Sequence, residues 1–311
     1  FLFRLVVAPL HQMLLLGDGR GMALTDNNGR WLIWQQAAAG IEQAPWLGYG
    51  WNQTPSAHAA GVLKFPGPGT FTNAHNVILD LLAWTGIPIG IVLVGTCIYW
   101  LVSRASRAAR PETICAMAVV MPVFTHSLVE YPFAYGFFLV PVGLLIGFVE
   151  ARLPAAPVRQ VRKQWIWICA AVWSLSGMAV VYEYIQIEED FRVIRFENMN
   201  IGRVPQGYEA PKLHVLTHMG AMLDASRLRP TPGMSNDQLE VLGKISHRFS
   251  YGALALRNAI ALGLNGNPEA ASRQMAVIKA MYGNAYYAAA VSEIRQLQAT
   301  KYPQLGAVQT P

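Results

Sequence analysis

The sequence is poor in charge and in cysteine. Asp, Glu, Lys and Arg together make up 14% of its 311 residues, whereas soluble domains average about 25%. The three cysteines, Cys97, Cys115 and Cys169, all lie in apolar stretches. This placement argues against a disulfide scaffold, and the cysteine spacing does not support a cysteine-based metal site.

The sequence is instead rich in long apolar runs. Hydrophobic residues make up 53% of the chain, and its mean hydropathy is +0.28. Most of the apolar runs fall in residues 1–185, whereas residues 186–311 have the mixed composition of a soluble domain. The net charge of +6 does not indicate a nucleic-acid partner, because the basic residues are scattered or flank apolar runs.

Four of these runs predict transmembrane helices, each of which needs about 20 mainly apolar residues. They cover residues 77–101, 113–130, 133–149 and 165–185. Because the chain starts at Phe1 within another apolar run, we interpret it as the C-terminal portion of a larger protein. The predicted organisation is the end of a transmembrane segment at 1–16, an outer loop at 17–76, four transmembrane helices at 77–185 and a soluble helical domain at 186–311.

The basic residues predict the orientation of these helices. Loops 103–112 and 151–164 both carry several Lys or Arg residues, whereas the turn between the second and third spans carries none. Cytoplasmic loops are enriched in Lys and Arg. Loop 17–76, the turn at Tyr131 and the soluble domain are therefore expected to face outward. Gly86 and Pro88 are expected to break or kink the first span near its start.

The soluble domain is expected to be helical. Its predicted helices cover 188–200, 213–228, 236–249, 251–264, 268–281 and 285–299. The sequence Asn-Gly-Asn-Pro at 265–268 predicts a turn with proline at the start of the next helix. The two helices around this turn are typical of a single tetratricopeptide-like hairpin, but three repeats are absent, so a solenoid is not predicted.

Polar residues gather at the predicted outer ends of two spans. His75 and Asn76 immediately precede the first span, and His126 and Glu130 lie near the outer end of the second. Ionisable residues are costly at a membrane and commonly functional there. The outer loop is about sixty residues long, which is unusual for a connection without a function. These observations predict an active site at the outer membrane surface.

Several motifs, in this order along the chain, resemble the O-antigen ligase/polymerase superfamily. They are Arg-x-x-x-Trp (Arg30, Trp34), Pro-x-x-Gly-x-Gly (Pro45, Gly48, Gly50) and His-Asn opening a span with Gly-x-Pro (His75, Asn76, Gly86, Pro88). The segment HSLVEYPFAYGFFLVPVGLLIGFVE at 126–150 narrows the resemblance to the PglL-type ligases, the bacterial O-oligosaccharyltransferases. The soluble domain is also similar to the one that ends many of those ligases, so the resemblance covers essentially the whole chain.

The resemblance implies a multi-pass enzyme of the bacterial inner membrane with a GT-C-like, all-α fold. Such an enzyme transfers a glycan from undecaprenyl diphosphate to a Ser or Thr hydroxyl of a periplasmic protein, often a pilin, without a metal or another cofactor. Further N-terminal spans are expected by analogy. The alternatives within the superfamily are an O-antigen ligase, with lipid A-core as acceptor, and a repeat-unit polymerase. A transporter is disfavoured, because its polar residues should line a path across the bilayer.

Two residues are the main candidates for the chemistry. His75 is the candidate general base, since imidazole exchanges protons efficiently near neutral pH; the alternative is a helix-capping or interfacial histidine. No Asp-x-Asp motif is present to hold a cation, so Arg30 is the candidate contact for the diphosphate, because guanidinium matches phosphate geometry. The alternative for Arg30 is a lipid headgroup contact, and Arg20 is a second candidate for the diphosphate.

The other candidates are polar neighbours of these two. Asn76 orients His75 or binds the sugar, and the alternative is that it caps the following helix. Asp80 polarises a neighbour or pairs with a cation, and the alternative is an ordinary interfacial carboxylate. His126 and Glu130, with the spacing i, i+4, are predicted to share a helix face. They form either a catalytic relay, with Tyr131 contacting the substrate, or a structural pair between helices.

Overall fold

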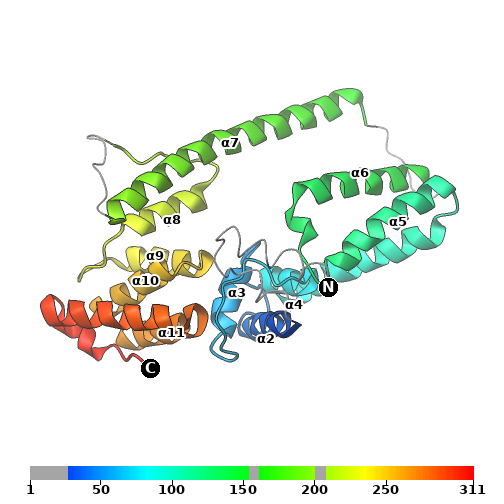
Figure 1. Ribbon diagram of the computed structural model, residues 1–311. Coiled ribbons are helices and arrows are strands. Elements are labelled where there is room, and N and C mark those ends of the chain that lie inside the picture. The colour runs from blue at the N-terminus through cyan, green and yellow to red at the C-terminus, as the bar shows by residue number, and fades with distance from the viewer. Residues whose placement is uncertain (1–26, 154–160, 200–207) are drawn as a thin grey trace, which may run out of the picture. The chain divides into compact units, whose positions relative to one another are not determined.

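Helices form all the regular structure in the described residues, which are 27–153, 161–199 and 208–311 of the computed structural model (Figure 1). The all-helical prediction is therefore confirmed for these residues. The chain divides into two compact units: the first contains residues 1–67 and 71–146, and the second contains 68–70 and 147–311. The predicted span end at 1–16 and Arg20 lie outside the described residues.

Two short helices begin the first unit. Helix α2 (Asn27–Gln43) packs against α3 (Thr54–Gly61) through glycines. A Cβ atom on Gly40 would lie 2.1 Å from the carbonyl oxygen of Ala57, and one on Gly61 would lie 1.9 Å from that of Gln36. Only glycine allows two backbones to approach this closely. The pair forms a rigid support for the start of the next helix.

Helix α4 (Val77–Arg107) is broken at Gly86, where φ is 78° and ψ is 170°, and Pro88 follows inside the helix. The break confirms the predicted kink. It frees backbone groups that the Pro-x-x-Gly-x-Gly loop then satisfies: Tyr49 N donates to Ala83 O at 2.8 Å, Gly50 N to Trp84 O at 3.0 Å, and Ile87 N to Pro45 O at 2.7 Å. This pairing accounts for the loop motif, since buried backbone groups need partners.

The remaining helices of the apolar region are α5 (Pro111–His126), η1 (Pro132–Ala134), α6 (Gly136–Arg152) and α7 (Lys163–Met199). Among the described residues, α4 and α7 are long and apolar enough to cross a membrane. Helices α5 and α6 have 16 and 17 residues, fewer than the roughly 20 that a span needs. Four spans therefore stay a prediction.

Helix α7 continues without a break across residues 185–186, where the sequence predicts the change from a span to a soluble domain. The separate helix predicted at 188–200 is thus wrong, since residues 188–199 extend the same helix; residue 200 lies outside the described residues. The segment contains no proline, and its last glycine is Gly177. Nothing in the local sequence stops a helix that has begun. The part of α7 most suited to a membrane has none of its residues buried.

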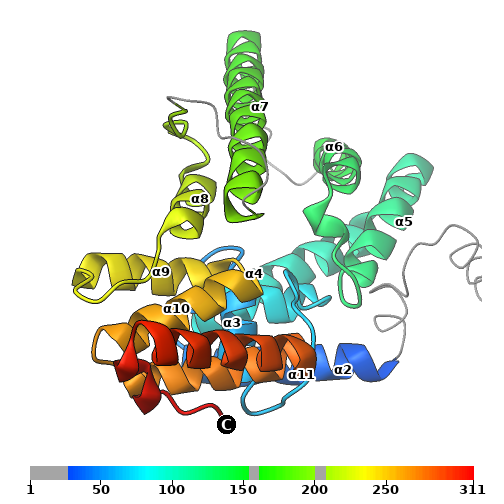
Figure 2. The ribbon, with the colours of Figure 1, turned by 60° about the vertical axis from the view of Figure 1, so that its left-hand side comes forward.

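The second unit ends in α8 (Thr217–Arg227), α9 (Asn236–Arg248), α10 (Gly252–Leu264), α11 (Pro268–Thr300) and η2 (Pro303–Ala307), which Figure 2 shows in a view turned by 60° from that of Figure 1. Helices α10 and α11 form the predicted hairpin around a shared core that includes Ala259, Met275 and Ile278. The likeness to a tetratricopeptide repeat stays a prediction. The two helices expected at 268–281 and 285–299 form one element with a break at Gly283, where φ is 78°.

Candidate functional site

A carboxylate joins the two main candidate residues in the first unit. Glu130 accepts from His75, with 2.9 Å between its Oε2 and His75 Nδ1, and its Oε1 forms an ion pair with Arg30. The side chains of Arg30, Glu130 and His75 are 35%, 29% and 15% exposed. The three are partly buried and still reachable by a ligand. We call them the Glu130 cluster.

The Glu130 cluster corrects the predicted pairing of His126 with Glu130 on one helix face. Helix α5 ends at His126, and a turn brings Glu130 back to the start of α4. The residue before a proline avoids helical conformation, so the chain turns ahead of Pro132. Ser127 O accepts from Val77 N at 2.8 Å, which fixes this turn beside His75. His126 itself is exposed.

The Arg-x-x-x-Trp motif is explained by the spacing of residues on α2. Side chains four residues apart share one face of a helix. Arg30 reaches Glu130, and Trp34 donates from its indole nitrogen to Ala74 O at 3.0 Å. The motif therefore holds both the carboxylate and the residue before His75.

His75 has an unusual backbone. Its φ is +52°, in the left-handed region that costs a residue with a side chain roughly 1–2 kcal/mol. Strained residues of this kind cluster at active sites and ligand clamps. Asn76 resolves its two predicted roles in favour of helix capping: its Oδ1 accepts from Ile78 N at 3.0 Å and from Leu79 N at 3.2 Å.

Asp80 lies beneath the cluster and away from solvent. Its side chain is fully buried, and its Oδ1 accepts from Ala74 N at 2.9 Å and from Thr54 Oγ1 at 2.6 Å. Thr54 in turn accepts from the indole nitrogen of Trp84 at 2.8 Å. The substrate contact predicted for Asp80 is not supported by this burial. Sequence reasoning missed Thr54, which belongs to no recognised motif.

Tyr131 contacts the ring of His75. The two ring centroids lie 4.7 Å apart in an edge-to-face arrangement, and Tyr131 also stacks on Tyr135 at 5.6 Å. A hydrogen bond with Tyr135 raises the pKa of Tyr131, with smaller contributions from burial and from the charge of Glu130. The phenol thus keeps its proton at neutral pH, and its ring packs against His75.

The hydrogen bonds define what the Glu130 cluster can do chemically. A carboxylate is an acceptor only, so His75 Nδ1 donates to it and Nε2 is left as the acceptor nitrogen in the neutral ring. Glu130 is also able to stabilise the imidazolium that forms when Nε2 takes a proton. Arg30 supplies a permanent positive charge beside them. The cluster combines a base, its orienting group and an anion-binding cation.

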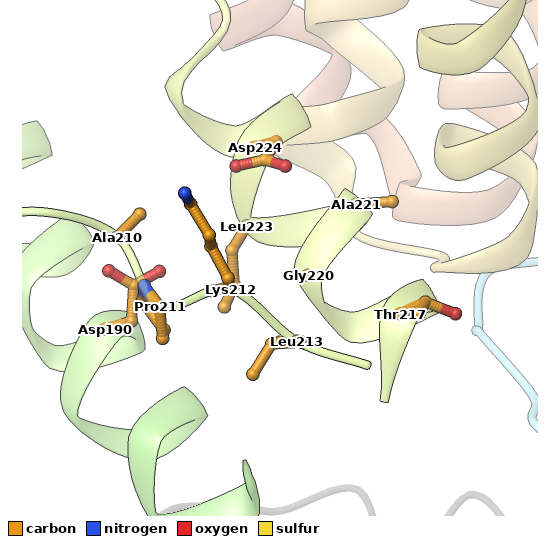
Figure 3. Close-up of a pocket in the computed structure, with 10 residues that line it drawn as sticks. All are labelled: Asp190, Ala210, Pro211, Lys212, Leu213, Thr217, Gly220, Ala221, Leu223 and Asp224. Atoms are coloured by element: carbon orange, nitrogen blue, oxygen red, sulfur yellow. The ribbon is translucent and has the colours of Figure 1, made fainter. Parts of the chain in front are cut away.

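A second cluster, which we call the Asp190 cluster, lies in the second unit. Asp190 on α7 binds both terminal nitrogens of Arg227 on α8, at 2.5 and 2.8 Å, and accepts from Tyr208 at 2.7 Å. A cavity of about 420 Å³ lies beside it (Figure 3). It is lined by Lys212, Thr217 and Asp224 together with mostly small or apolar neighbours.

Comparisons with known proteins agree with these motifs. The family described as "Virulence factor membrane-bound polymerase, C-terminal" matches residues 114–296, more than half of the chain. The family described as "O-Antigen ligase" matches residues 4–94. The chain belongs to this superfamily of membrane-bound ligases and polymerases. The first match contains His126, Glu130 and Tyr131, and the second contains Arg30 and His75, so the Glu130 cluster is assembled from both matched regions.

Two curated relatives place the chain in the PglL-type branch of the superfamily, as the sequence resemblance predicted. The chain is 30% identical over 262 residues to the "General O-oligosaccharyltransferase" of Acinetobacter baylyi, which covers 82% of this chain and 44% of that protein. It is 35% identical over 130 residues to the "ComP-specific O-oligosaccharyltransferase" of the same organism, covering 42% and 24%. The chain thus spans less than half the length of these relatives. No solved structure matches it.

Proposed function

We propose that this superfamily member is an O-linked oligosaccharyltransferase that moves a glycan from undecaprenyl diphosphate to a Ser or Thr hydroxyl of a periplasmic protein such as a pilin. The observation that carries the proposal is the Glu130 cluster, in which a strained histidine, its carboxylate partner and an arginine meet at the start of an apolar helix. The names of the two relatives support the same activity.

The cluster suits the transfer step. His75 Nε2 removes the proton of the acceptor hydroxyl as its oxygen attacks the anomeric carbon of the glycan. The bond between that carbon and the diphosphate oxygen breaks, and the diphosphate leaves with the electron pair. Glu130 holds Nδ1 at 2.9 Å and offsets the charge of the imidazolium. General-base assistance of this kind contributes about 10²- to 10⁴-fold.

Arg30 serves the leaving group in this proposal. Its guanidinium has five N–H donors, and the part-exposed side chain leaves some of them beyond Glu130 available to phosphate oxygens. Glu130 keeps the guanidinium oriented when no donor is bound. Tyr131, whose ring packs against that of His75 with 4.7 Å between the centroids, contacts the substrate in this proposal. Asn76, whose side chain caps α4, takes no direct part in the reaction.

The two substrates explain why the Glu130 cluster would lie at the membrane surface. A lipid-linked donor lies in the bilayer, whereas the acceptor protein lies in water, so the two meet at the surface. The exposed apolar face of α7 and the long apolar α4 are consistent with insertion in the inner membrane. We place the Glu130 cluster on the periplasmic side, with residues 186–311 in the periplasm and available for recruiting the acceptor.

A second candidate function remains within the superfamily. The description of the family that matches residues 114–296 names a polymerase, and that of the N-terminal match names an O-antigen ligase. A polymerase extends the glycan on its lipid carrier, and a ligase passes it to lipid A-core. The same base and cation would serve both reactions, because only the acceptor hydroxyl differs.

The test uses the protein in a bacterial host that lacks its own ligase and contains a lipid-linked glycan pathway and a pilin. Intact mass measurement shows which molecule carries the sugar. Glycan on the pilin, lost with His75→Ala while the variant still accumulates in the membrane, is the expected result. Glycan on lipid A-core, or longer chains on the lipid carrier, would instead support the second candidate. Substantial transfer by His75→Ala would contradict the role of His75 in either reaction.

A further inference from the structure

The residue before His75 is held on both sides of its peptide group. Ala74 is fully buried. Its N–H donates to Asp80 on α4 at 2.9 Å, and its carbonyl accepts from Trp34 on α2 at 3.0 Å. Two helices that are distant in sequence thus fix the backbone on which the left-handed conformation of His75 depends.

The Asp80 contact is the end of a directed chain of hydrogen bonds. An indole nitrogen can only donate, so Trp84 donates to Thr54 Oγ1 at 2.8 Å. The hydroxyl hydrogen of Thr54 is then available for Asp80, whose Oδ1 lies 2.6 Å away. The chain therefore runs from Trp84 through Thr54 to Asp80, whose Oδ1 also accepts from the N–H of Ala74.

The hydrogen bonds of this chain are shielded from water. Thr54 is 1% exposed and Asp80 is 0% exposed, so water does not replace a lost partner. Polar groups that are buried without a partner cost roughly 1–3 kcal/mol each. A hydroxyl that both accepts and donates is therefore required at position 54. Neither residue reaches solvent, so their effect on a ligand must pass through the backbone of His75.

We propose that Thr54 is a positioning residue for His75, acting through the buried carboxylate of Asp80 on the Ala74 peptide. The inference rests on the proposed function for its kinetic readout and deepens that function by adding a residue outside all the recognised motifs. The Thr54–Asp80 contact orients the peptide that enters the left-handed His75. His75 Nδ1 is thereby kept at hydrogen-bonding distance from Glu130.

The main experiment compares Thr54→Val with Thr54→Ser in the full protein in membranes. Valine has nearly the shape of threonine but no hydroxyl, whereas serine keeps the hydroxyl. Thr96→Val is the matched control, because Thr96 lies on α4 and its hydroxyl binds only the carbonyl of Val92 in its own helix. Two quantities are measured: the rate of glycan transfer as a function of donor concentration, and the acylation of His75 by diethyl pyrocarbonate relative to the exposed His126.

We expect Thr54→Val to lower the maximal transfer rate about 10- to 100-fold, as small misplacements of a catalytic group do, with the donor KM unchanged. His75 should be acylated faster relative to His126, because its ring is released from Glu130. Thr54→Ser should restore both quantities, and Thr96→Val should change neither. A slower transfer with unchanged acylation of His75, or no rescue by serine, would show a merely structural role and overturn the proposal.

Two further comparisons cover the cases in which Thr54→Val does not accumulate or the unmodified protein transfers no glycan. If Thr54→Val does not accumulate, Trp84→Phe removes the donor to Thr54 while retaining an aromatic ring, and a smaller change in the same direction is expected in both readouts. Unchanged values in that variant would overturn the proposal. If the unmodified protein transfers no glycan to any acceptor, the proposed function fails, whereas the acylation of His75 still decides whether Thr54 positions it.

Discussion

The two units each contain a carboxylate that binds an arginine, and the differences between the two clusters are informative. Asp190 is 1% exposed, and its oxygens are fully engaged by Arg227 and Tyr208. Glu130 is 29% exposed and pairs with a histidine whose φ is +52°. The carboxylate of the Asp190 cluster is buried and the described backbone there is unstrained, whereas the carboxylate of the Glu130 cluster is part-exposed and its histidine is strained.

These differences separate a structural cluster from a functional one. Burial is the largest cause that raises the pKa of Tyr208, to about 12, and its hydrogen bond to Asp190 adds to the effect. The phenol does not titrate at physiological pH, and the hydrogen bonds of the Asp190 cluster join α7 to α8. The Glu130 cluster contains a residue type that changes its charge near neutral pH. It has both the access and the proton chemistry that a reaction needs.

The largest effect that this comparison predicts is a loss of stability when Asp190 is substituted. Asp190→Asn removes the buried charge that pairs with part-exposed Arg227, and breaking a fully buried ion pair costs about 3–5 kcal/mol, which is the upper bound here. We therefore expect a clearly lower melting temperature in detergent, with unchanged glycan transfer per folded molecule. The matched control is Glu189→Gln, which removes the neighbouring exposed ion pair with Arg192 and should cost less than about 1 kcal/mol. Equal effects of the two substitutions would contradict the structural role.

The second largest expected effect is a loss of glycan transfer when Glu130 is substituted. Glu130→Gln keeps the size of the side chain but removes the charge, and an amide is able to hold His75 in either tautomer. We expect transfer to fall about 10- to 100-fold, with little change in melting temperature because the residue is part-exposed. Glu42→Gln breaks an exposed ion pair with Lys64 on the same unit and should leave transfer unchanged. A Glu130 variant that loses stability and keeps its activity would show that the Glu130 cluster is structural, as the Asp190 cluster is.

The smallest effect is expected at His126. The sequence suggests a catalytic pair with Glu130, but the side chain is exposed at the end of α5 and Glu130 binds His75 and Arg30 instead. His126→Ala should change transfer by no more than about twofold, as exposed substitutions typically amount to about 0.5 kcal/mol. A large loss of transfer in this variant would show that His126 joins the reaction and would enlarge the Glu130 cluster.

Local signals in the sequence predicted local structure well. A helix cap was one of the two roles predicted for Asn76 ahead of an apolar run, and the two hydrogen bonds from Ile78 and Leu79 confirm it. Gly86 with Pro88 predicted a break in α4, and the gap between two predicted helices near residue 283 corresponds to the break at Gly283. Each of these features depends on a few neighbouring residues, because capping and backbone conformation are decided within one turn.

The sequence by itself determined the helical class, the apolar segments, the family and the candidates His75, Arg30 and Glu130. Only the tertiary structure decided how the candidates pair: Glu130 lies 55 residues from His75 and 100 residues from Arg30. It also showed that the hydroxyl of Thr54 forms hydrogen bonds with Trp84 and Asp80. Spacing along a chain fixes contacts within a helix, whereas contacts between helices depend on packing, and packing depends on the whole chain at once.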